Sequence, residues 1–501
     1  MGLKKQLIKW ISKLITTKKN KEIKGALFFQ NQIWKNLVKK AKHTKFGIDH
    51  HFEDIKNYTD FKSKVPIVDY EQLKPYIDLI LEGKKDILWP GKPIYLAKTS
   101  GTTSGTKYIP LTKDSIPNHF GTARNAVFHY IASTQNADFM EGKMIFLSGS
   151  PTLEKKSDIL VGRLSGISNH LIPKWLKSNQ LPSYQTNCIE EWEEKIDQIV
   201  QETKNQDLRL ISGIPPWVQM YYEKLLEATG KKNILEIFPN LSMFVYGGVN
   251  FEPYRNQLEK LVGKSIPSIE TYPASEGFIA YQDKQNEPGL LLNINSGIFF
   301  EFIPTETYFS EKPQRISLAE VQMHVNYALV LNTNAGLWGY SIGDTVQFVS
   351  LDPYRIIITG RIKHFISAFG EHVIGKEVEK ALMHAMQKHS FSIVEFTVAP
   401  QVNPENNEKP YHEWFIEFEE SPQNLTEIAN TIDLALQEQN LYYQDLIDGN
   451  ILQSLKVRSL QKDSFRNYMK SQGKLGGQNK VPRLSNDRKI ADSLVKFVIY
   501  E

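Results

Sequence analysis

The sequence predicts a two-domain α/β protein, with a large N-terminal domain in residues 1–360 and a small α+β domain in residues 361–501. At 501 residues the chain is too long for one ordinary domain. Apolar runs alternate with helical patterns between residues 90 and 300, which is typical of mixed or parallel sheets covered by helices. After Gly360-Arg361 the composition becomes more charged, and this change marks the second domain.

The elements of the large domain follow from the spacing of its apolar residues. We expect strands at residues 144–147, 208–214, 243–246 and 268–272, and helices at 113–134, 190–204, 216–229 and 252–262. From residue 290 to 350 four apolar runs follow one another closely: LLLNI, IFFEFIP, ALVLNT and TVQFVS. Such closely spaced strands predict an antiparallel subdomain attached to the sheet.

In the small domain, helices alternate with strands. We expect helices at 376–388 and 424–438, and strands at 391–399 and 411–418. The segment 403–410 is rich in Asn, Pro and Glu and predicts a hairpin loop, and the glycine-containing segment 471–483 predicts a mobile loop.

Composition excludes several classes of protein. The net charge of +4 is too small to indicate a nucleic-acid partner. The single cysteine, Cys188, excludes an internal disulfide and a cysteine-based zinc site and fits a reducing cytosol. No run of eighteen apolar residues is present. We therefore expect a cytoplasmic protein, and nothing in the sequence indicates its oligomeric state.

The N-terminal segment is strongly basic. Residues 1–46 contain many lysines and one acid, Glu22, and Leu7, Ile8, Ile11, Leu14 and Ile15 recur at helical spacing. It lacks the apolar length and cleavage site of a signal peptide. We expect a helix whose apolar face packs on its own domain, with contact to an anionic membrane surface as the alternative.

The segment KTSGTTSGTKYIPLT, residues 98–112, carries the first chemical motif. It combines Ser and Thr hydroxyls, glycines and two lysines between two apolar runs. Glycines allow close approach of backbone N–H groups, hydroxyls donate hydrogen bonds and lysine supplies charge, so the loop is suited to phosphate. It is not a Walker loop, because Thr106 stands where that motif requires glycine.

Two further motifs carry carboxylates. In Thr271–Gly277, TYPASEG, Glu276 follows a predicted strand, where ligands of α/β sheets bind, and a carboxylate there suits Mg²⁺ that also contacts phosphates. In Gly339–Asp344, GYSIGD, an aspartate after a glycine turn can accept the hydroxyls of a ribose. Taken alone, each motif is also compatible with an ordinary surface turn.

Together SGTTSG, YPASEG and YSIGD, in this order, resemble the three nucleotide motifs of the firefly-luciferase-like adenylate-forming superfamily. The Y-x-x-S-E form, the YSIGD motif and QNKVPR near the C-terminus resemble one branch, the auxin-responsive (Gretchen Hagen) acyl acid amido synthetases of plants and their bacterial relatives. Ser341 departs from this branch, which has arginine there. The resemblance covers roughly residues 20–500 and implies the adenylate-forming enzyme fold.

The resemblance also implies a reaction. A small carboxylic acid, expected to be aromatic, attacks the α-phosphorus of ATP and releases pyrophosphate, with Mg²⁺ as cofactor, and an amino acid amine then displaces AMP to give an amide. By similarity, the nucleotide site comprises Ser100, Gly101, Thr102, Thr103, Lys107, Gly247, Tyr272, Ser275 and Asp344. Glu276 would bind the metal, Tyr272 would line the adenine pocket and Asp344 would bind the ribose.

Four more positions come from the same resemblance. Lys480, in the glycine-rich GGQNKVPR, matches the catalytic lysine that the small domain carries into the site. The hinge is expected near residues 360–363, which include Lys363. Arg124, on the predicted helix 113–134, matches an arginine that binds the carboxylate of the acyl substrate in plant relatives. A guanidinium suits this role because it can form two parallel hydrogen bonds with a carboxylate. Gly248 follows Gly247 beside the expected adenine site.

Two other functions fit the same motifs. An acyl-CoA ligase would share the first step and use a thiol acceptor, although QNKVPR favours the amido branch. A non-catalytic binding protein of the same fold would have damaged motifs, whereas the Ser/Thr, Glu and Asp positions are intact.

Overall fold

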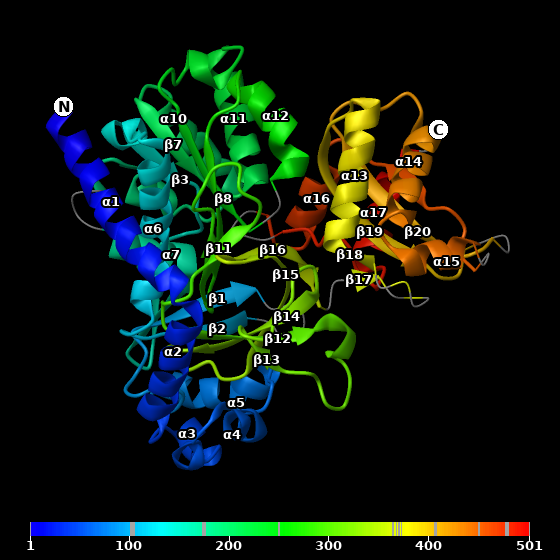
Figure 1. Ribbon diagram of the computed structural model, residues 1–501. Helices are drawn as coiled ribbons and strands as arrows, with labels where there is room; N and C mark the ends of the chain where they lie inside the picture. Colours follow the sequence, from blue (N-terminus) through cyan, green and yellow to red (C-terminus); the bar gives the residue numbers. More distant parts are fainter. Residues whose placement is uncertain are drawn as a thin grey trace. The chain divides into compact units, whose positions relative to one another are not determined.

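The computed structural model describes residues 2–100, 106–172, 177–248, 251–362, 365–366, 368, 371, 373–404, 408–448, 451–475 and 480–499. The chain forms two compact units (Figure 1). The first contains residues 1–249 and 263–357, and the second contains residues 250–262 and 358–501. No helix among the described residues has both the length and the apolar character needed to span a bilayer.

A single sheet forms the framework of the first unit. Among the described residues it has twelve strands, in the order β13-β12-β14-β15-β16-β11-β10-β9-β8-β7-β3-β6. The strands are β3 (Lys143–Phe146), β6 (Gln180–Leu181), β7 (Leu208–Ser212), β8 (Met243–Gly247), β9 (Ser268–Ala274), β10 (Gly277–Tyr281), β11 (Leu290–Leu292), β12 (Ile298–Pro304), β13 (Ile316–Ser317), β14 (Asn326–Thr333), β15 (Tyr340–Leu351) and β16 (Tyr354–Arg361). From β6 to β9 neighbouring strands run parallel, and β9 pairs antiparallel with β10.

Helices alternate with the strands of the first unit along the chain. They are α6 (Ile116–Thr134), α7 (Leu164–Leu171), α9 (Tyr184–Asn187), α10 (Trp192–Thr203) and α11 (Pro215–Thr229). Helix α11 begins with two prolines and ends at Gly230, which has φ +66°. These are the residues that favour the first turn and the end of a helix, respectively. Helix α6 packs on β9 and β10, so it lies directly behind the second sequence motif.

A second sheet holds the first sequence motif. Its four strands are β1 (Tyr95–Ser100), β2 (Thr106–Leu111), β4 (Glu154–Lys156) and β5 (Ile159–Arg163), in the order β2-β1-β5-β4. Strands β1 and β2 are antiparallel neighbours, with Ser100 opposite Thr106. Residues 101–105, which connect them in sequence, lie outside the described part of the chain.

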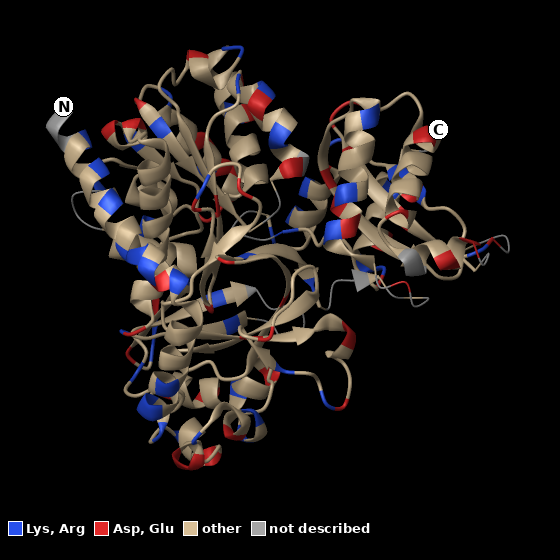
Figure 2. Ribbon diagram, in the orientation of Figure 1, with Lys and Arg blue, Asp and Glu red and all other residues tan. Residues whose placement is uncertain are grey.

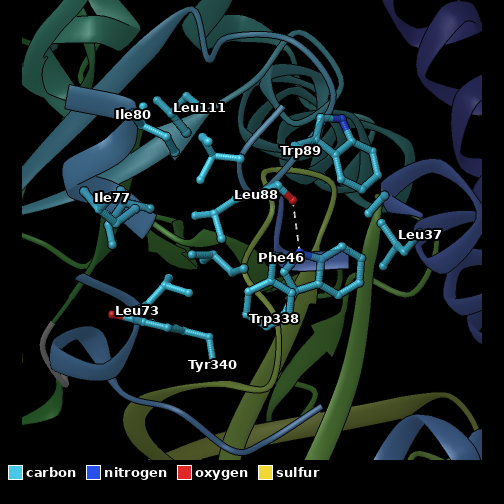
Figure 3. Close-up of a cluster of buried hydrophobic side chains, with 14 of the residues drawn as sticks. Leu37, Phe46, Leu73, Ile77, Ile80, Leu88, Trp89, Leu111, Trp338 and Tyr340 are labelled. Carbon is cyan, nitrogen blue, oxygen red and sulfur yellow. Dashed lines mark hydrogen bonds between the residues drawn. The ribbon is translucent and has the colours of Figure 1, made fainter. Parts of the chain in front are cut away.

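Four of the N-terminal helices pack against this second sheet, whereas the first helix of the chain, α1 (Gly2–Lys24), packs on α6. The four are α2 (Ala26–Ala41), α3 (Lys45–Asp49), α4 (Tyr58–Lys64) and α5 (Tyr70–Leu81). Their apolar side chains form one core with β1, β2 and Trp338, whose indole Nε1 donates to the Leu88 carbonyl oxygen at 3.1 Å (Figure 3). Because Tyr340 belongs to the same core, the start of β15 rests on a rigid apolar base.

The second unit is a small α+β domain. A three-stranded sheet, β19-β20-β21, is formed by β19 (Ile393–Gln401), β20 (Tyr411–Phe418) and β21 (Lys456–Ser459). A short pair, β17 (Phe365–Ile366) and β18 (Val373–Ile374), precedes it. The helices are α12 (Glu252–Val262), α13 (Gly375–His389), α14 (Leu425–Gln437), α15 (Leu441–Asp448), α16 (Ser464–Ser471) and α17 (Lys489–Leu494). Helix α12 packs on α13 and β19, which is why residues 250–262 belong to this unit.

Most predicted elements are confirmed. Each predicted helix and strand named above is present within a few residues of its expected bounds, and α12 has the expected bounds. The runs from 290 to 350 are strands β11, β12, β14 and β15. They continue the large sheet, so the antiparallel part and the parallel part share one framework.

Candidate active site

The carboxyl ends of the parallel strands meet at one edge of the large sheet. Strand β8 ends at Gly247, which lies opposite Thr271 of β9. A Cβ at Gly247 would collide with the carbonyl oxygen and the hydroxyl of Thr271, and that hydroxyl donates to the Tyr246 carbonyl oxygen at 2.8 Å. The missing side chain at Gly247 is therefore required by the neighbouring strand. Gly248 follows with φ +87°, a conformation that favours glycine.

The second motif forms a tight hairpin at this edge. Ala274 of β9 pairs with Gly277 of β10, so Ser275 and Glu276 make the turn. Asn118 of α6 holds the hairpin from behind, because its Oδ1 accepts from the Phe278 N–H at 2.7 Å and its Nδ2 donates to the Phe278 carbonyl oxygen at 3.2 Å. Ser275 and Glu276 are half-buried, so both are accessible to a ligand.

The third motif lies on a bulge of β15. Thr345 pairs with Ala328 and Ser341 pairs with Val330, so residues 342–344 stand opposite the single residue Leu329. Gly343 has φ +84°, and nothing lies within 4 Å of the position its Cβ would take. Its glycine is therefore explained by backbone conformation, as at other bulges that redirect a side chain.

A hydrogen bond joins the second and third motifs. The hydroxyl of Tyr272 donates to Oδ2 of Asp344 at 2.7 Å. In the sheet order, β9 and β15 are separated by β10, β11 and β16. Flat strands this far apart would lie about 19 Å from one another, which no tyrosine–aspartate pair can span. The antiparallel strands therefore curl around their common core, which includes Tyr272, and bring the two motifs together.

The segment Val68–Tyr70 links the third motif to the first. The Ser341 N–H donates to the Val68 carbonyl oxygen at 2.8 Å, and the Val68 N–H donates to the Gly339 carbonyl oxygen at 2.9 Å. On the other side, the Tyr108 N–H of β2 donates to the Tyr70 hydroxyl at 2.9 Å. A capping box at the start of α5, between Asp69 and Gln72, fixes this segment.

The described lysines around the first motif have different environments. Lys107 Nζ lies 5.5 Å from the centre of the Tyr70 ring. Lys98 Nζ forms an ion pair with Glu154 at 2.6 Å. Ser100 lies opposite Thr106 of β2. Gly101, Thr102 and Thr103 lie outside the described residues, as does Lys363 of the expected hinge.

The residues present are compatible with Mg²⁺ held jointly with a phosphate. Within the part of the chain that the structure describes, no group of three or more His, Cys, Asp or Glu could hold a metal alone. Mg²⁺ in nucleotide sites is commonly held by one or two carboxylates together with phosphate oxygens and water. The single half-buried carboxylate of Glu276, at the turn of its hairpin, fits that donor set.

Two further predicted residues, Arg124 and Lys480, belong to different units of the chain. Arg124 is an exposed residue of α6. Lys480, in the second unit, is exposed and begins a well-anchored segment: the Val398 N–H donates to the Arg483 carbonyl oxygen at 2.9 Å, and Thr397 donates to the Pro482 carbonyl oxygen at 2.7 Å. The Arg483 guanidinium pairs with Glu395 and bonds to Tyr254 of α12.

The sequence did not single out Asn118, Tyr70 or the Gly343 bulge. Asn118 begins a buried polar stripe on α6, followed by Thr122, Asn125 and His129 at helical spacing. Polar residues on the inward face of a helix were the available signal, because such groups need buried partners. Asn118 donates directly to the Phe278 carbonyl oxygen. Thr122 accepts from the amide of Asn293, which also donates to that carbonyl oxygen.

In comparison with known proteins, three models of one family match successive parts of the chain. The model of the GH3 family N-terminal domain matches residues 18–180 and 154–267, that of the GH3 family central domain residues 291–361, and that of the GH3 family C-terminal domain residues 376–489. Jasmonoyl–L-amino acid synthetase JAR4 of Nicotiana attenuata is 23% identical over 480 residues, 80% of this chain and 79% of that protein. Indole-3-acetic acid-amido synthetase GH3.3 of Arabidopsis thaliana is 21% identical over 567 residues, 94% and 91% of the two chains.

Two kinds of solved structure share the fold. GH3.15 acyl acid amido synthetase has a TM-score of 0.78 at 16% identity and covers 98% of this chain and 97% of its own. 2-Hydroxyisobutyryl-CoA ligase in the postadenylation state has a TM-score of 0.63 at 12% identity, covering 94% and 91%. The predicted fold class is therefore confirmed. With three consecutive family models matched over most of its length, the chain belongs to the GH3 family.

Proposed function

We propose that this protein is an ATP-dependent acyl acid amido synthetase, which joins a small, aromatic carboxylic acid to an amino acid through an acyl-adenylate. The observation that carries the proposal is the bond between Tyr272 and Asp344. It joins two motifs 72 residues apart, and the segment Val68–Tyr70 connects them to strand β2 of the first motif. Family membership and the activities of the named relatives support the same conclusion.

In the first step, an oxygen of the substrate carboxylate attacks the α-phosphorus of ATP. The bond from the α-phosphorus to the oxygen bridging the β-phosphorus breaks, and pyrophosphate leaves with that electron pair. Both reactants are anionic, so donor groups and positive charge must stabilise the transition state. The hydroxyls of Ser100, Thr102 and Thr103, the backbone of Gly101 and the ammonium of Lys107 are proposed to supply these at the phosphates.

The nucleoside has separate contacts in this proposal. Asp344 accepts hydrogen bonds from the ribose hydroxyls, because a carboxylate that accepts one bond from Tyr272 keeps further lone pairs. Tyr272, with Gly247 and Ser275, lines the adenine side. Glu276 binds Mg²⁺, which neutralises phosphate charge when bound. Arg124 is proposed to hold the carboxylate of the acyl substrate through its two-pronged guanidinium.

In the second step, the amine nitrogen of the amino acid attacks the acyl carbon, AMP leaves, and the amine loses a proton. We propose that the first unit carries the nucleotide and acyl sites and that Lys480, in the second unit, is a catalytic residue whose charge acts in one conformation. We also propose a bacterial-type member of the family, related to the firefly-luciferase-like enzymes. Because the fold is also similar to that of a CoA ligase, we retain acyl-CoA ligation through the same acyl-adenylate as a second candidate function.

ATP–pyrophosphate exchange tests the first step. With Mg²⁺ and a panel of aryl and indole carboxylic acids, we expect exchange that depends on one class of acid. Glu276→Gln is expected to reduce it about 100-fold or more, the scale for a lost electrostatic partner in a transition state. Glu287→Gln, which removes an exposed carboxylate from the loop between β10 and β11, serves as the matched control. Equal exchange by the two variants would contradict the role of Glu276, and exchange without any acid would contradict the reaction.

A further inference from the structure

Helix α1 docks on the first unit through one face, as expected, but not through all of the predicted apolar residues, since Leu7 and Leu14 are exposed. It lies along α6, and its Ser12 and Thr16 are buried there. Their hydroxyls bond to carbonyl oxygens of the same helix, to Lys9 at 2.7 Å and to Ser12 at 2.9 Å. Ile8 and Ile23 pack against the core beneath α6. Small hydroxyl residues allow the two helices to approach closely, so α1 is firmly attached to the first unit by this face.

The outer face of α1 carries a second apolar stripe. Leu7, Trp10 and Leu14 keep 54%, 60% and 51% of their surface exposed. At 3.6 residues per turn, the three side chains project within about 60° of one another. Docking on α6 therefore does not explain them. Three large apolar side chains in one exposed line are unusual for a helix whose other face already supplies its packing.

Lysines surround this stripe. Lys13 and Lys18 project on either side of it, and Lys21 and Lys24 follow towards the end of the helix; all four are exposed. Among the described residues none of the four has a carboxylate partner within ion-pair distance. The one acid of α1, Glu22, is half-buried and pairs with Lys19 at 2.6 Å. Figure 2 shows the resulting row of basic residues along α1.

We propose that the outer face of α1 binds an anionic lipid surface. Leu7, Trp10 and Leu14 insert among the upper acyl chains, where an indole ring is favoured at the boundary between apolar and polar layers. The lysines extend from the flanks of the stripe to the negatively charged headgroups, with their methylene chains along its edge. The helix lies in the plane of the surface and does not cross it.

Charge argues against the other occupants. A second copy of the chain, paired through the same face, would bring the unpaired lysines of the two helices together. A nucleic acid would use the lysines but would leave the three apolar side chains in water. The combination of exposed Trp and Leu with unpaired lysines is the one that an anionic bilayer satisfies as a whole. This inference does not depend on the proposed enzymatic activity.

Co-sedimentation of the full-length protein with vesicles tests the proposal. We expect binding to vesicles of phosphatidylcholine with phosphatidylserine, little binding to phosphatidylcholine alone, and weakening at high salt. Replacing Lys13, Lys18, Lys21 and Lys24 by Gln is expected to weaken binding about 100-fold or more, and replacing them by Arg is expected to preserve it. The matched control replaces four other exposed lysines, Lys85, Lys92, Lys231 and Lys232, by Gln.

The apolar stripe is tested separately. Leu7→Ser, Trp10→Ser and Leu14→Ser together are expected to abolish vesicle binding, whereas Phe309→Ser, which removes an exposed aromatic ring elsewhere, is expected to leave it unchanged. An unchanged thermal midpoint would show that α1 keeps its inner packing. The proposal is overturned if the wild type does not bind anionic vesicles, or if the four-lysine control variant loses as much binding as the variant with the four α1 lysines replaced by Gln. Self-association without lipid that the stripe variant abolishes would also overturn it, in favour of a dimer face.

Discussion

The Tyr272 hydroxyl and the Asp344 carboxylate lie 2.7 Å apart, although the two residues are 72 positions apart in the sequence and belong to different motifs. The residue types could be predicted, because a carboxylate after a glycine turn and a tyrosine before Ser-Glu form recognisable motifs. Their bond could not be predicted, since it depends on the curl of the sheet across the three strands between β9 and β15. The sequence therefore predicts the chemical type of the two residues but not the contact between them.

We expect Tyr272→Phe to raise the KM for ATP about tenfold, because Asp344 loses a donor that orients its carboxylate, and bonds to charged groups contribute about 1.5–3 kcal/mol. Steady-state pyrophosphate release at varied ATP measures this. Tyr443→Phe is a matched control, since Tyr443 donates to Asp433 at 2.6 Å in the second unit. The same rise in KM in both variants would contradict a local role for Tyr272.

His119 of α6 makes stability depend on pH. The ring is buried and its Nδ1 lacks a partner among the described atoms, and burial lowers its pKa to about 4. Between about pH 6.5 and pH 4 the unfolded chain binds a proton at this histidine and the folded chain does not. Stability therefore falls as pH falls through this window, by on the order of 3 kcal/mol in total.

This contribution is measured by comparing the thermal midpoints of the wild type and the His119→Asn variant at about pH 7 and about pH 5. We expect the wild type to lose more of its midpoint than the variant on acidification, because the variant has no proton to bind there. Parallel losses in the two proteins would show that His119 does not contribute.

At the scale of elements, strands with a buried face were predictable and exposed ones were not. Strand β4, Glu154–Lys156, is exposed at all three residues, so it has no apolar pattern and was missed. The second sheet was consequently not expected as a separate structure. The bulge in β15 was also missed, because an isolated glycine in a strand does not reveal how many residues stand opposite its neighbour.

Gly343→Val tests whether this bulge positions Asp344. Valine at φ +84° is strained although its Cβ meets no neighbour, so the bulge is expected to rearrange and adenylation to slow about tenfold or more. Gly343→Asn should be milder, since asparagine tolerates this conformation. Gly230→Val is the matched control: Gly230 has φ +66° and equally open surroundings at the end of α11. Adenylation that slows as much in the control would indicate a general loss of stability.

At the scale of the molecule, the sequence located α12 but not the unit to which it belongs. An amphipathic pattern predicts a helix and its apolar face, but not the partner of that face. Tyr254 of α12 bonds to Arg483, 229 residues away. Arg483 lies three residues after Lys480, in the segment that runs beside β19. Helix α12, between β8 and β9, is thus bonded to the side chain that ends the GGQNKVPR motif of Lys480.

Lys480→Ala is expected to slow the overall reaction at least about tenfold while leaving the Kd for ATP unchanged. The reason is that a lysine presented on the second unit contributes charge to the reacting complex rather than to nucleotide binding. Rapid-quench measurement of each half-reaction, together with equilibrium binding of ATP, checks this. Lys474→Ala, in the preceding loop, is the comparison. Unchanged rates in both half-reactions would remove Lys480 from the mechanism.

Identification of the product by mass tests the central claim most directly. The protein is incubated with ATP, Mg²⁺, an acid that supports pyrophosphate exchange, and either pooled amino acids or coenzyme A. We expect the mass of an amide between that acid and one amino acid, with AMP formed in equal amount, and no product with coenzyme A. A thioester in place of the amide, or AMP formation without any joined product, would contradict assignment as an amido synthetase.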